Sequence, residues 1–212
     1  MQAGLNELTE KYLMTQNLTG VILAGGASTR FNGRIKAKIV IDGKTIISRI
    51  LDTFGDIFDD LIIVTNNPEE FIEYNHCKII GDFFMNKGPL GGIHAAMKIS
   101  DRDALFVVAG DMPLLDKKII SLQTEFYKNN KCDIVIPQIN NNIEPLHGIY
   151  NRSLVGTLEA YLQHSDNFAI REFLKMADVR YLNIEDSVGA RNAFTNINSP
   201  DDILAARKLP GK

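Results

Sequence analysis

Short hydrophobic runs alternate along the chain with segments in which apolar residues recur at helical spacing. The runs predict buried strands at residues 19–24, 61–65, 77–80, 104–109 and 133–137. The helical spacing predicts helices over 46–54, from Pro68, from Gly91, and over 117–128, 151–163 and 168–177. We expect an edge strand at 146–150 and a loop at 140–142. Strands that alternate with helices are typical of an α/β fold. Here we expect a three-layer αβα, Rossmann-like fold, in which helices cover both faces of a mainly parallel sheet.

The start of the chain is predicted to lie outside this fold. A helical extension is expected over residues 1–17, because apolar side chains recur there at near-helical spacing, at Leu5, Leu8, Tyr12 and Leu13. Residues 18–212 contain no internal repeat and no linker rich in proline, glycine or serine. They are therefore predicted to form a single domain.

The first strand runs directly into a glycine pair, Gly25 and Gly26. Open α/β sheets bind their ligands at this kind of strand end. Glycines allow backbone N–H groups to approach a phosphate without an obstructing side chain, and Arg30 and Lys36 follow with positive charge. The segment therefore predicts a cradle for a triphosphate.

A second phosphate motif is incomplete. Residues 43–45 end like a P-loop, but Lys38 occupies the position of that motif's first glycine. Asp42 and Gly43 instead give a strong hairpin-turn signal between two apolar arms. We therefore expect a β-hairpin at this point.

Polar side chains also follow two later segments. Asp111 comes directly after a wholly apolar strand, where it could hold Mg²⁺ against phosphate oxygens or cap the next helix. Near the end of the chain, Asn196 and Asn198 would point to the same face of a strand. Ser199 and Asp202 that follow are typical of a helix cap.

Composition narrows the choice of partners. A formal net charge of −3 favours neither nucleic acid nor an anionic membrane, and no apolar run approaches 18 residues. The two cysteines suggest neither a disulfide framework nor a structural zinc site, which favours a protein of the reducing cytoplasm. The histidines show no metal-binding spacing either and are expected at the surface or as satisfied core residues, at positions 76, 94, 147 and 164. A small, mobile ligand is therefore the expected partner.

Four motifs follow one another along the chain: LAGG with S-x-R-F at residues 23–31, GPLGG at 88–92, GDMPLL at 110–115, and N-x-N-S-P-D-D at 196–202. Together they resemble one family, the molybdenum cofactor guanylyltransferases. The resemblance runs from about residue 18 to residue 208. It implies the nucleotidyltransferase version of the fold and transfer of GMP from GTP to the phosphate of molybdopterin, with Mg²⁺ as cofactor. Transient contact with cofactor-delivery proteins is compatible with that activity.

The resemblance also implies roles for individual residues. Contacts to GTP would come from Leu23, Ala24, Gly25, Gly26, Lys36, Asn66 and Asp82. The metal would be held by Asp111, and the catalytic residues would be Arg30, Lys36 and Asp111. The acceptor would be bound by Gly88, Arg171, Asn196 and Asn198, and Gly33 matches a position associated with activity. The chain departs from the family in having Asn32 where glycine is usual and Ile35 where an acidic residue is frequent.

The absence of a nucleophile motif fits such a reaction, because an attacking phosphate monoester, with a second pKa of about 6, needs no base at neutral pH. Two alternatives remain at this point. One is a cytidylyl- or sugar-phosphate nucleotidyltransferase of the same fold. The other is a nucleotide-binding module without catalysis, which would be free to lose Lys36 or Asp111, although both are present.

Overall fold

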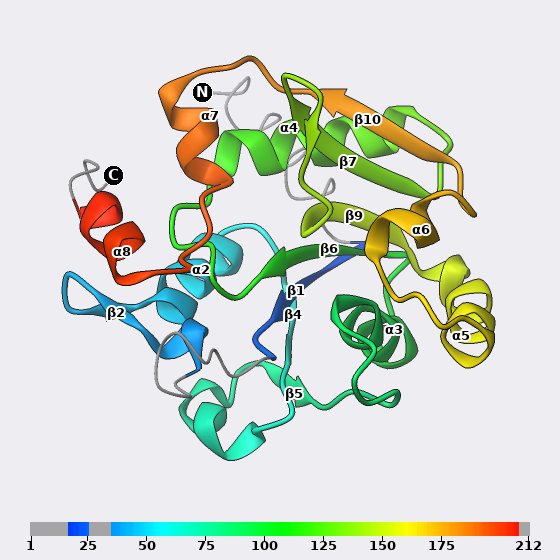
Figure 1. Ribbon diagram of the computed structural model, residues 1–212, viewed down its shortest axis with the longest axis horizontal. Helices are drawn as coiled ribbons and strands as arrows, with labels where there is room; N and C mark the ends of the chain where they lie inside the picture. The colour runs from blue at the N-terminus through cyan, green and yellow to red at the C-terminus, as the bar shows by residue number, and fades with distance from the viewer. Residues whose placement is uncertain (1–16, 26–34, 208–212) are drawn as a thin grey trace, which may run out of the picture.

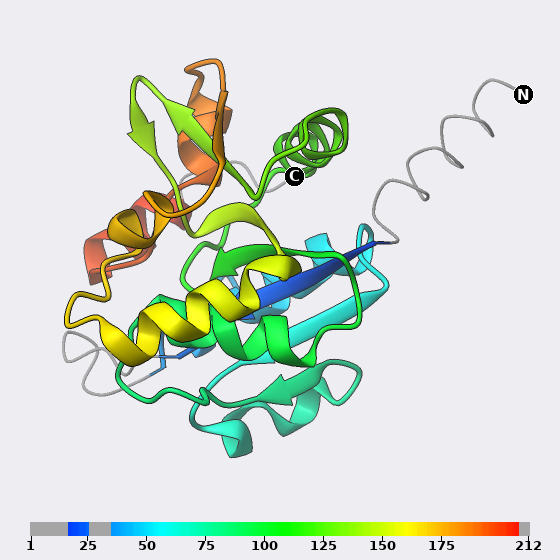
Figure 2. The same cartoon turned by 90° about the vertical axis from the view of Figure 1, so that its right-hand side faces the viewer.

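The computed structural model describes residues 17–25 and 35–207. The predicted N-terminal helix and four residues discussed above therefore lie outside the described residues; these are Gly26, Arg30, Asn32 and Gly33. An eight-stranded sheet forms the centre, with helices on both faces (Figures 1 and 2). The α/β fold with a mainly parallel sheet is confirmed.

The parallel part of the sheet carries the predicted buried strands. Strand β1 (Leu18–Leu23) pairs in parallel with β4 (Asp60–Val64) on one side and β6 (Ala104–Ala109) on the other. Strand β5 (Lys78–Ile80) continues the parallel order beyond β4. The carboxyl ends of these strands therefore lie along one edge of the sheet.

The strand predicted at 146–150 is present as β9 (His147–Asn151), but its expected position at the edge is wrong, because β9 lies inside the sheet. It runs antiparallel between β6 and β7 (Ile134–Ile139), and its Ile149 and Tyr150 are fully buried. Because β9 runs the opposite way, its first residue lies at the edge where the parallel strands end. This reversal brings the loop before β9 to the same edge as the carboxyl ends of the parallel strands.

Two short strands next to β7, named β10 and β8, were not predicted from the sequence. Strand β10 (Val179–Asn183) pairs in parallel with β7, and its half-exposed residues give a weak hydrophobic signal. The predicted loop at 140–142 is wrong at Asn142, which begins β8 (Asn142–Ile143). Asn140 and Asn141 form the turn between β7 and β8 with positive φ, a conformation that asparagine tolerates.

The helices divide between the two faces of the sheet. Helices α2 (Ile46–Gly55) and α4 (Lys117–Asn129) cover one face, and α3 (Pro89–Ile99) and α5 (Val155–His164) cover the other (Figure 1). Helix α3 begins before the expected Gly91, because proline suits the first turn of a helix.

Shorter helical segments complete the chain. The helix expected from Pro68 is a 3₁₀ helix, η3 (Pro68–Tyr74), and the expected helix at 151–163 is split into η4 (Arg152–Leu154) and α5. Helix α6 (Ile170–Leu174) is shorter than predicted, and α7 (Val188–Ala193) was not predicted. Two further helical segments are η2 (Lys36–Lys38), a 3₁₀ helix, and α8 (Pro200–Arg207), an α-helix.

The expected hairpin is present and excludes a P-loop. Strands β2 (Val40–Ile41) and β3 (Lys44–Thr45) pair around Asp42 and Gly43, which have φ values of 49° and 78°. Thr45 then caps α2, because its side chain accepts a hydrogen bond from the Ser48 backbone N–H.

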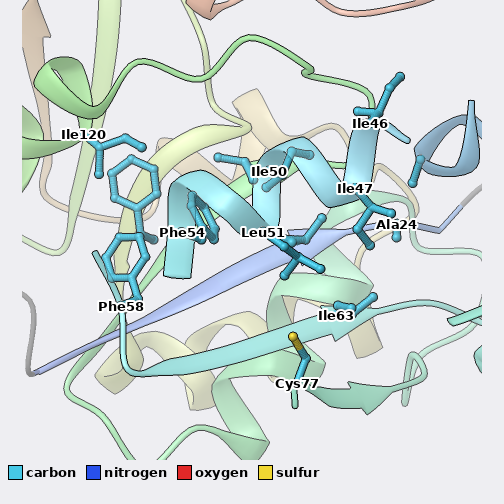
Figure 3. Close-up of a cluster of buried hydrophobic side chains, with 14 of the residues drawn as sticks. Ala24, Ile46, Ile47, Ile50, Leu51, Phe54, Phe58, Ile63, Cys77 and Ile120 are labelled. Carbon is cyan, nitrogen blue, oxygen red and sulfur yellow. The ribbon is translucent and has the colours of Figure 1, made fainter. Parts of the chain in front are cut away.

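Strand alternation places two cores on opposite sides of the sheet. On β6, Phe106 and Val108 belong to the core under α2, whereas Leu105 and Val107 belong to the core under α3. The core under α2 contains Phe54, whose ring lies edge-on to Phe58 with centroids 5.0 Å apart (Figure 3). Aromatic pairs in this geometry add to the free energy gained from burial.

A substitution at Gly20 on β1 would test how tightly the core under α2 is packed. A Cβ atom there would lie 2.8 Å from Phe54 Cδ2 and 2.9 Å from Phe58 Cδ2, so we expect Gly20→Ala to lower the free energy of unfolding by about 1–3 kcal/mol. The control is Gly156→Ala in α5, where a Cβ has open space and alanine favours the helix. Denaturant unfolding checks both, and equal stability of the two variants would contradict this packing.

Candidate active site

A cavity of about 620 Å³ lies at the edge of the sheet where the parallel strands end. Its walls come from the ends of β1, β4 and β6, the loops before α3 and β9, helix α6 and the segment before α8. The cavity brings together the site residues predicted from the sequence that the structure describes: Leu23, Ala24, Gly25, Lys36, Asn66, Asp82, Gly88, Asp111, Arg171, Asn196 and Asn198.

The floor of the cavity depends on a close backbone contact at Gly110. Its N–H donates to the Leu23 carbonyl over 2.9 Å, and a Cβ at this position would lie 2.9 Å from that oxygen and 3.1 Å from Ala24 Cα. A side chain at residue 110 would therefore separate the ends of β1 and β6. The Ala24 N–H in turn donates to the Val64 carbonyl over 2.8 Å, so three strand ends are joined here.

One cation connects two parts of the cavity. Lys36 Nζ donates to Asp111 Oδ2 over 2.9 Å and to Asn198 Oδ1 over 2.5 Å. The Asp111 carbonyl also accepts from the Ile197 N–H over 2.9 Å. The end of β6 and the segment before α8 are therefore held together by side-chain and backbone hydrogen bonds.

The structure distinguishes the two interpretations of Asp111. Helix α4 is capped by Asp116, whose Oδ1 accepts from the Lys118 backbone N–H over 2.7 Å. Asp111 is not this cap, and its half-buried carboxylate lines the cavity instead. A capping role therefore does not account for this residue.

Asn66 and Asp82 form a second polar group at the far end of the cavity. Asn66 Nδ2 donates to Asp82 Oδ2 over 3.1 Å, and the Asp82 N–H donates to Asn66 Oδ1 over 3.0 Å. Burial raises the pKa of the Asp82 carboxyl, while the hydrogen bond from Asn66 opposes that shift. The pair presents both a carboxylate and an amide to a ligand.

The segment 196–198 is not a strand of the sheet, so that expectation is wrong. The expected alternation is nevertheless present, because Ile197 is fully buried while Asn196 and Asn198 line the cavity. The helix cap that follows is confirmed: the Ser199 N–H donates to Asp202 Oδ2 over 2.8 Å, and the Asp202 N–H donates to Ser199 Oγ over 3.3 Å.

Sequence reasoning missed the loop before β9. Glu144, Pro145 and Leu146 line the cavity. Burial raises the pKa of the Glu144 carboxyl, and the positive charge of Arg171 opposes the shift. The prediction of an edge strand gave neither the neighbours nor the direction of β9, so it could not show that this loop reaches the site.

In the part of the chain that the structure describes, no three His, Cys, Asp or Glu side chains are grouped in a way that could hold a metal ion. None of the described helices is long and apolar enough to cross a membrane.

The fold is that of nucleotidyltransferases. Molybdopterin-guanine dinucleotide biosynthesis protein A from Archaeoglobus fulgidus superposes with a TM-score of 0.75 over 90% of this chain and 97% of that one, at 23% identity. The family described as MobA-like NTP transferase domain matches residues 20–181. The chain belongs to this family and is an enzyme of the nucleotidyltransferase class.

Relatives of similar length share more of the sequence. A probable molybdenum cofactor guanylyltransferase of Natranaerobius thermophilus is 35% identical over 94% of this chain and 99% of its own length. The molybdenum cofactor guanylyltransferase of Desulfosudis oleivorans is 32% identical over 89% of this chain and 94% of its own length. Nucleotidyltransferases with this domain generally depend on a divalent metal.

His147 corrects the expectation that each core histidine is satisfied. Its ring is fully buried between Phe106 and Phe194, with centroid distances of 5.3 and 4.9 Å, and neither ring nitrogen has a hydrogen-bond partner. Burial lowers the pKa of His147 from 6.5 to about 4. The folded protein therefore holds this ring neutral.

We predict that His147 makes folding stability sensitive to acid. As the pH falls from about 6.5 to about 4, the unfolded chain binds a proton that the folded chain does not, so the free energy of unfolding decreases by about 3 kcal/mol on this account. Unfolding of the wild type and His147→Leu across this range checks the difference in slope. An identical pH dependence for the two proteins would contradict it.

Proposed function

We propose that the protein is a molybdenum cofactor guanylyltransferase, which transfers GMP from GTP to the phosphate of molybdopterin and releases pyrophosphate. One observation carries the proposal: a single cavity contains the Asn66–Asp82 pair, the Lys36–Asp111 pair and the asparagines before α8. The names of the relatives that match over nearly the whole chain support the same reaction.

The polar pair at the far end of the cavity suits guanine. Guanine has N1–H and N2–H donors beside each other and an O6 acceptor. The Asp82 carboxylate can accept from two donors, and the Asn66 amide can serve as donor or acceptor. Cytosine has an acceptor at N3 where the carboxylate requires a donor, so the pair discriminates against CTP.

The donor set fits Mg²⁺. This ion prefers oxygen ligands and usually takes one or two carboxylates together with waters and substrate phosphates. Asp111 supplies a half-buried carboxylate, next to Lys36, at the end of β6. The residue that would hold the ion is therefore Asp111, and the ion would supply charge neutralisation at the phosphates.

The side chains and backbone of the protein would bind GTP and the acceptor and align them for the reaction. Lys36 Nζ would bind the phosphates of GTP, assisted by backbone N–H groups of residues 23–26 and by Arg30. Gly88, Arg171, Asn196 and Asn198 would hold the acceptor phosphate. An oxygen of that phosphate bonds to the α-phosphorus of GTP, the bond from this phosphorus to the bridging oxygen breaks, and pyrophosphate leaves with that oxygen.

The direct test is the choice of nucleotide. We expect molybdopterin to gain GMP when the protein is incubated with Mg²⁺ and GTP, and kcat/KM for GTP to exceed that for CTP by about 100-fold or more, because CTP would leave buried polar groups unpaired. Mass spectrometry of the product with each of the four NTPs checks this. Comparable values for CTP and GTP would refute the guanylyl assignment.

A second test separates metal binding from capping at residue 111. We expect Asp111→Asn to fold normally but to lose activity by about 100-fold or more at millimolar Mg²⁺, because the anionic ligand is removed. The matched control is Asp116→Asn, which should keep its activity because asparagine caps a helix about as well as aspartate. Turnover across a Mg²⁺ titration is the measurement, and an active Asp111→Asn with normal metal dependence would contradict the role.

A further inference from the structure

Glu144 lines the cavity and has no part in the transfer described above. The backbone around it is held in place: its N–H donates to the Pro137 carbonyl and its carbonyl accepts from the His147 N–H, both over 3.0 Å. The next carbonyl, of Pro145, accepts from the buried Tyr150 hydroxyl over 2.7 Å. The residue is therefore fixed on the cavity wall before any ligand binds.

The order of the strands places Glu144 away from the nucleotide base. Asn66 follows β4, Gly25 follows β1, Asp111 follows β6, and Glu144 precedes the antiparallel β9. Neighbouring strands are about 4.8 Å apart, so the β4 and β9 positions are separated by about 14 Å along this edge. The phosphate-binding residues lie between them, and Glu144 is therefore on the acceptor side.

The charge of Glu144 determines which part of the acceptor it can contact. A carboxylate repels a phosphate, and the cationic and amide side chains on this side already match one, at Arg171, Asn196 and Asn198. A carboxylate binds well to two adjacent N–H donors. The pterin ring offers such a pair in N3–H and the 2-amino group. Burial, which raises the pKa of the Glu144 carboxyl, also favours a ligand that donates hydrogen bonds to it.

We propose that Glu144 determines acceptor specificity by accepting hydrogen bonds from N3–H and the 2-amino group of the pterin ring. The inference rests on the proposed function, which supplies a phosphorylated pterin as the acceptor. A second role must be separated from it, because Glu144 could instead orient Arg171 through their charges. The first role depends on the ring of the ligand, whereas the second acts on its phosphate.

Two probes distinguish these roles: 6-hydroxymethylpterin monophosphate, and the matching lumazine monophosphate, in which a carbonyl replaces the 2-amino group. We expect wild-type protein to bind the pterin probe about 10–100-fold more tightly, since a carboxylate left facing a carbonyl is unpaired. Glu144→Gln should lose or reverse this preference, because its amide can donate to the 2-carbonyl and accept from N3–H. The KM for GTP should change less than about twofold. Glu185→Gln, at an exposed position, is the control.

Calorimetric titration measures the Kd of each probe, and therefore the preference for pterin over lumazine, independently of turnover. A preference of Glu144→Gln equal to that of the wild type, or equal weakening of both probes, would overturn the inference and indicate an effect on phosphate binding. Absence of GMP transfer by the wild type, with the pterin preference intact, would instead refute the proposed reaction alone. Transfer without any ring preference would refute only the role of Glu144.

Discussion

The backbone contact between the ends of β1 and β6 is the constraint on which the rest of the site depends. Gly110 can approach Leu23 and Ala24 only because it has no side chain. This contact sets the positions of the backbone after β1 and of Asp111, which directly follows Gly110. The hydrogen bond from Ile197 to the Asp111 carbonyl then attaches the segment before α8 to the same point. Residues from three distant parts of the sequence are thereby held around one cavity.

Lys36 contacts both Asp111 at the end of β6 and Asn198 before α8, and its side chain is only 22% exposed. In the proposed function, these two contacts lie on the nucleotide side and the acceptor side of the cavity. Phosphoryl transfer depends mainly on positioning and on stabilisation of charge. A cation at this junction can contribute to both, which explains how a site without a nucleophile motif can be sufficient.

The sequence predicted the elements with the strongest patterns. Strand β1, helix α2 and the hairpin at Asp42–Gly43 have clear periodicity or turn chemistry, and each formed as expected. Asp111 could be found because it stands directly after the apolar strand β6. Only the resemblance to the family implied four others: Asn66, Asp82, Gly88 and Arg171. The sequence did not predict β10, because its half-exposed residues resemble a loop. It also missed Glu144, because hydrophobicity alone does not give the direction or the neighbours of β9.

A structure with a non-hydrolysable GTP analogue and Mg²⁺ tests the central claim most directly. The account predicts the guanine base against Asn66 and Asp82, the phosphates at Lys36, and the metal bound to Asp111. Glu144 should remain free of the nucleotide, on the opposite side of the phosphates. A base bound beside Glu144, or a metal bound away from Asp111, would contradict the division of the cavity into nucleotide and acceptor sides.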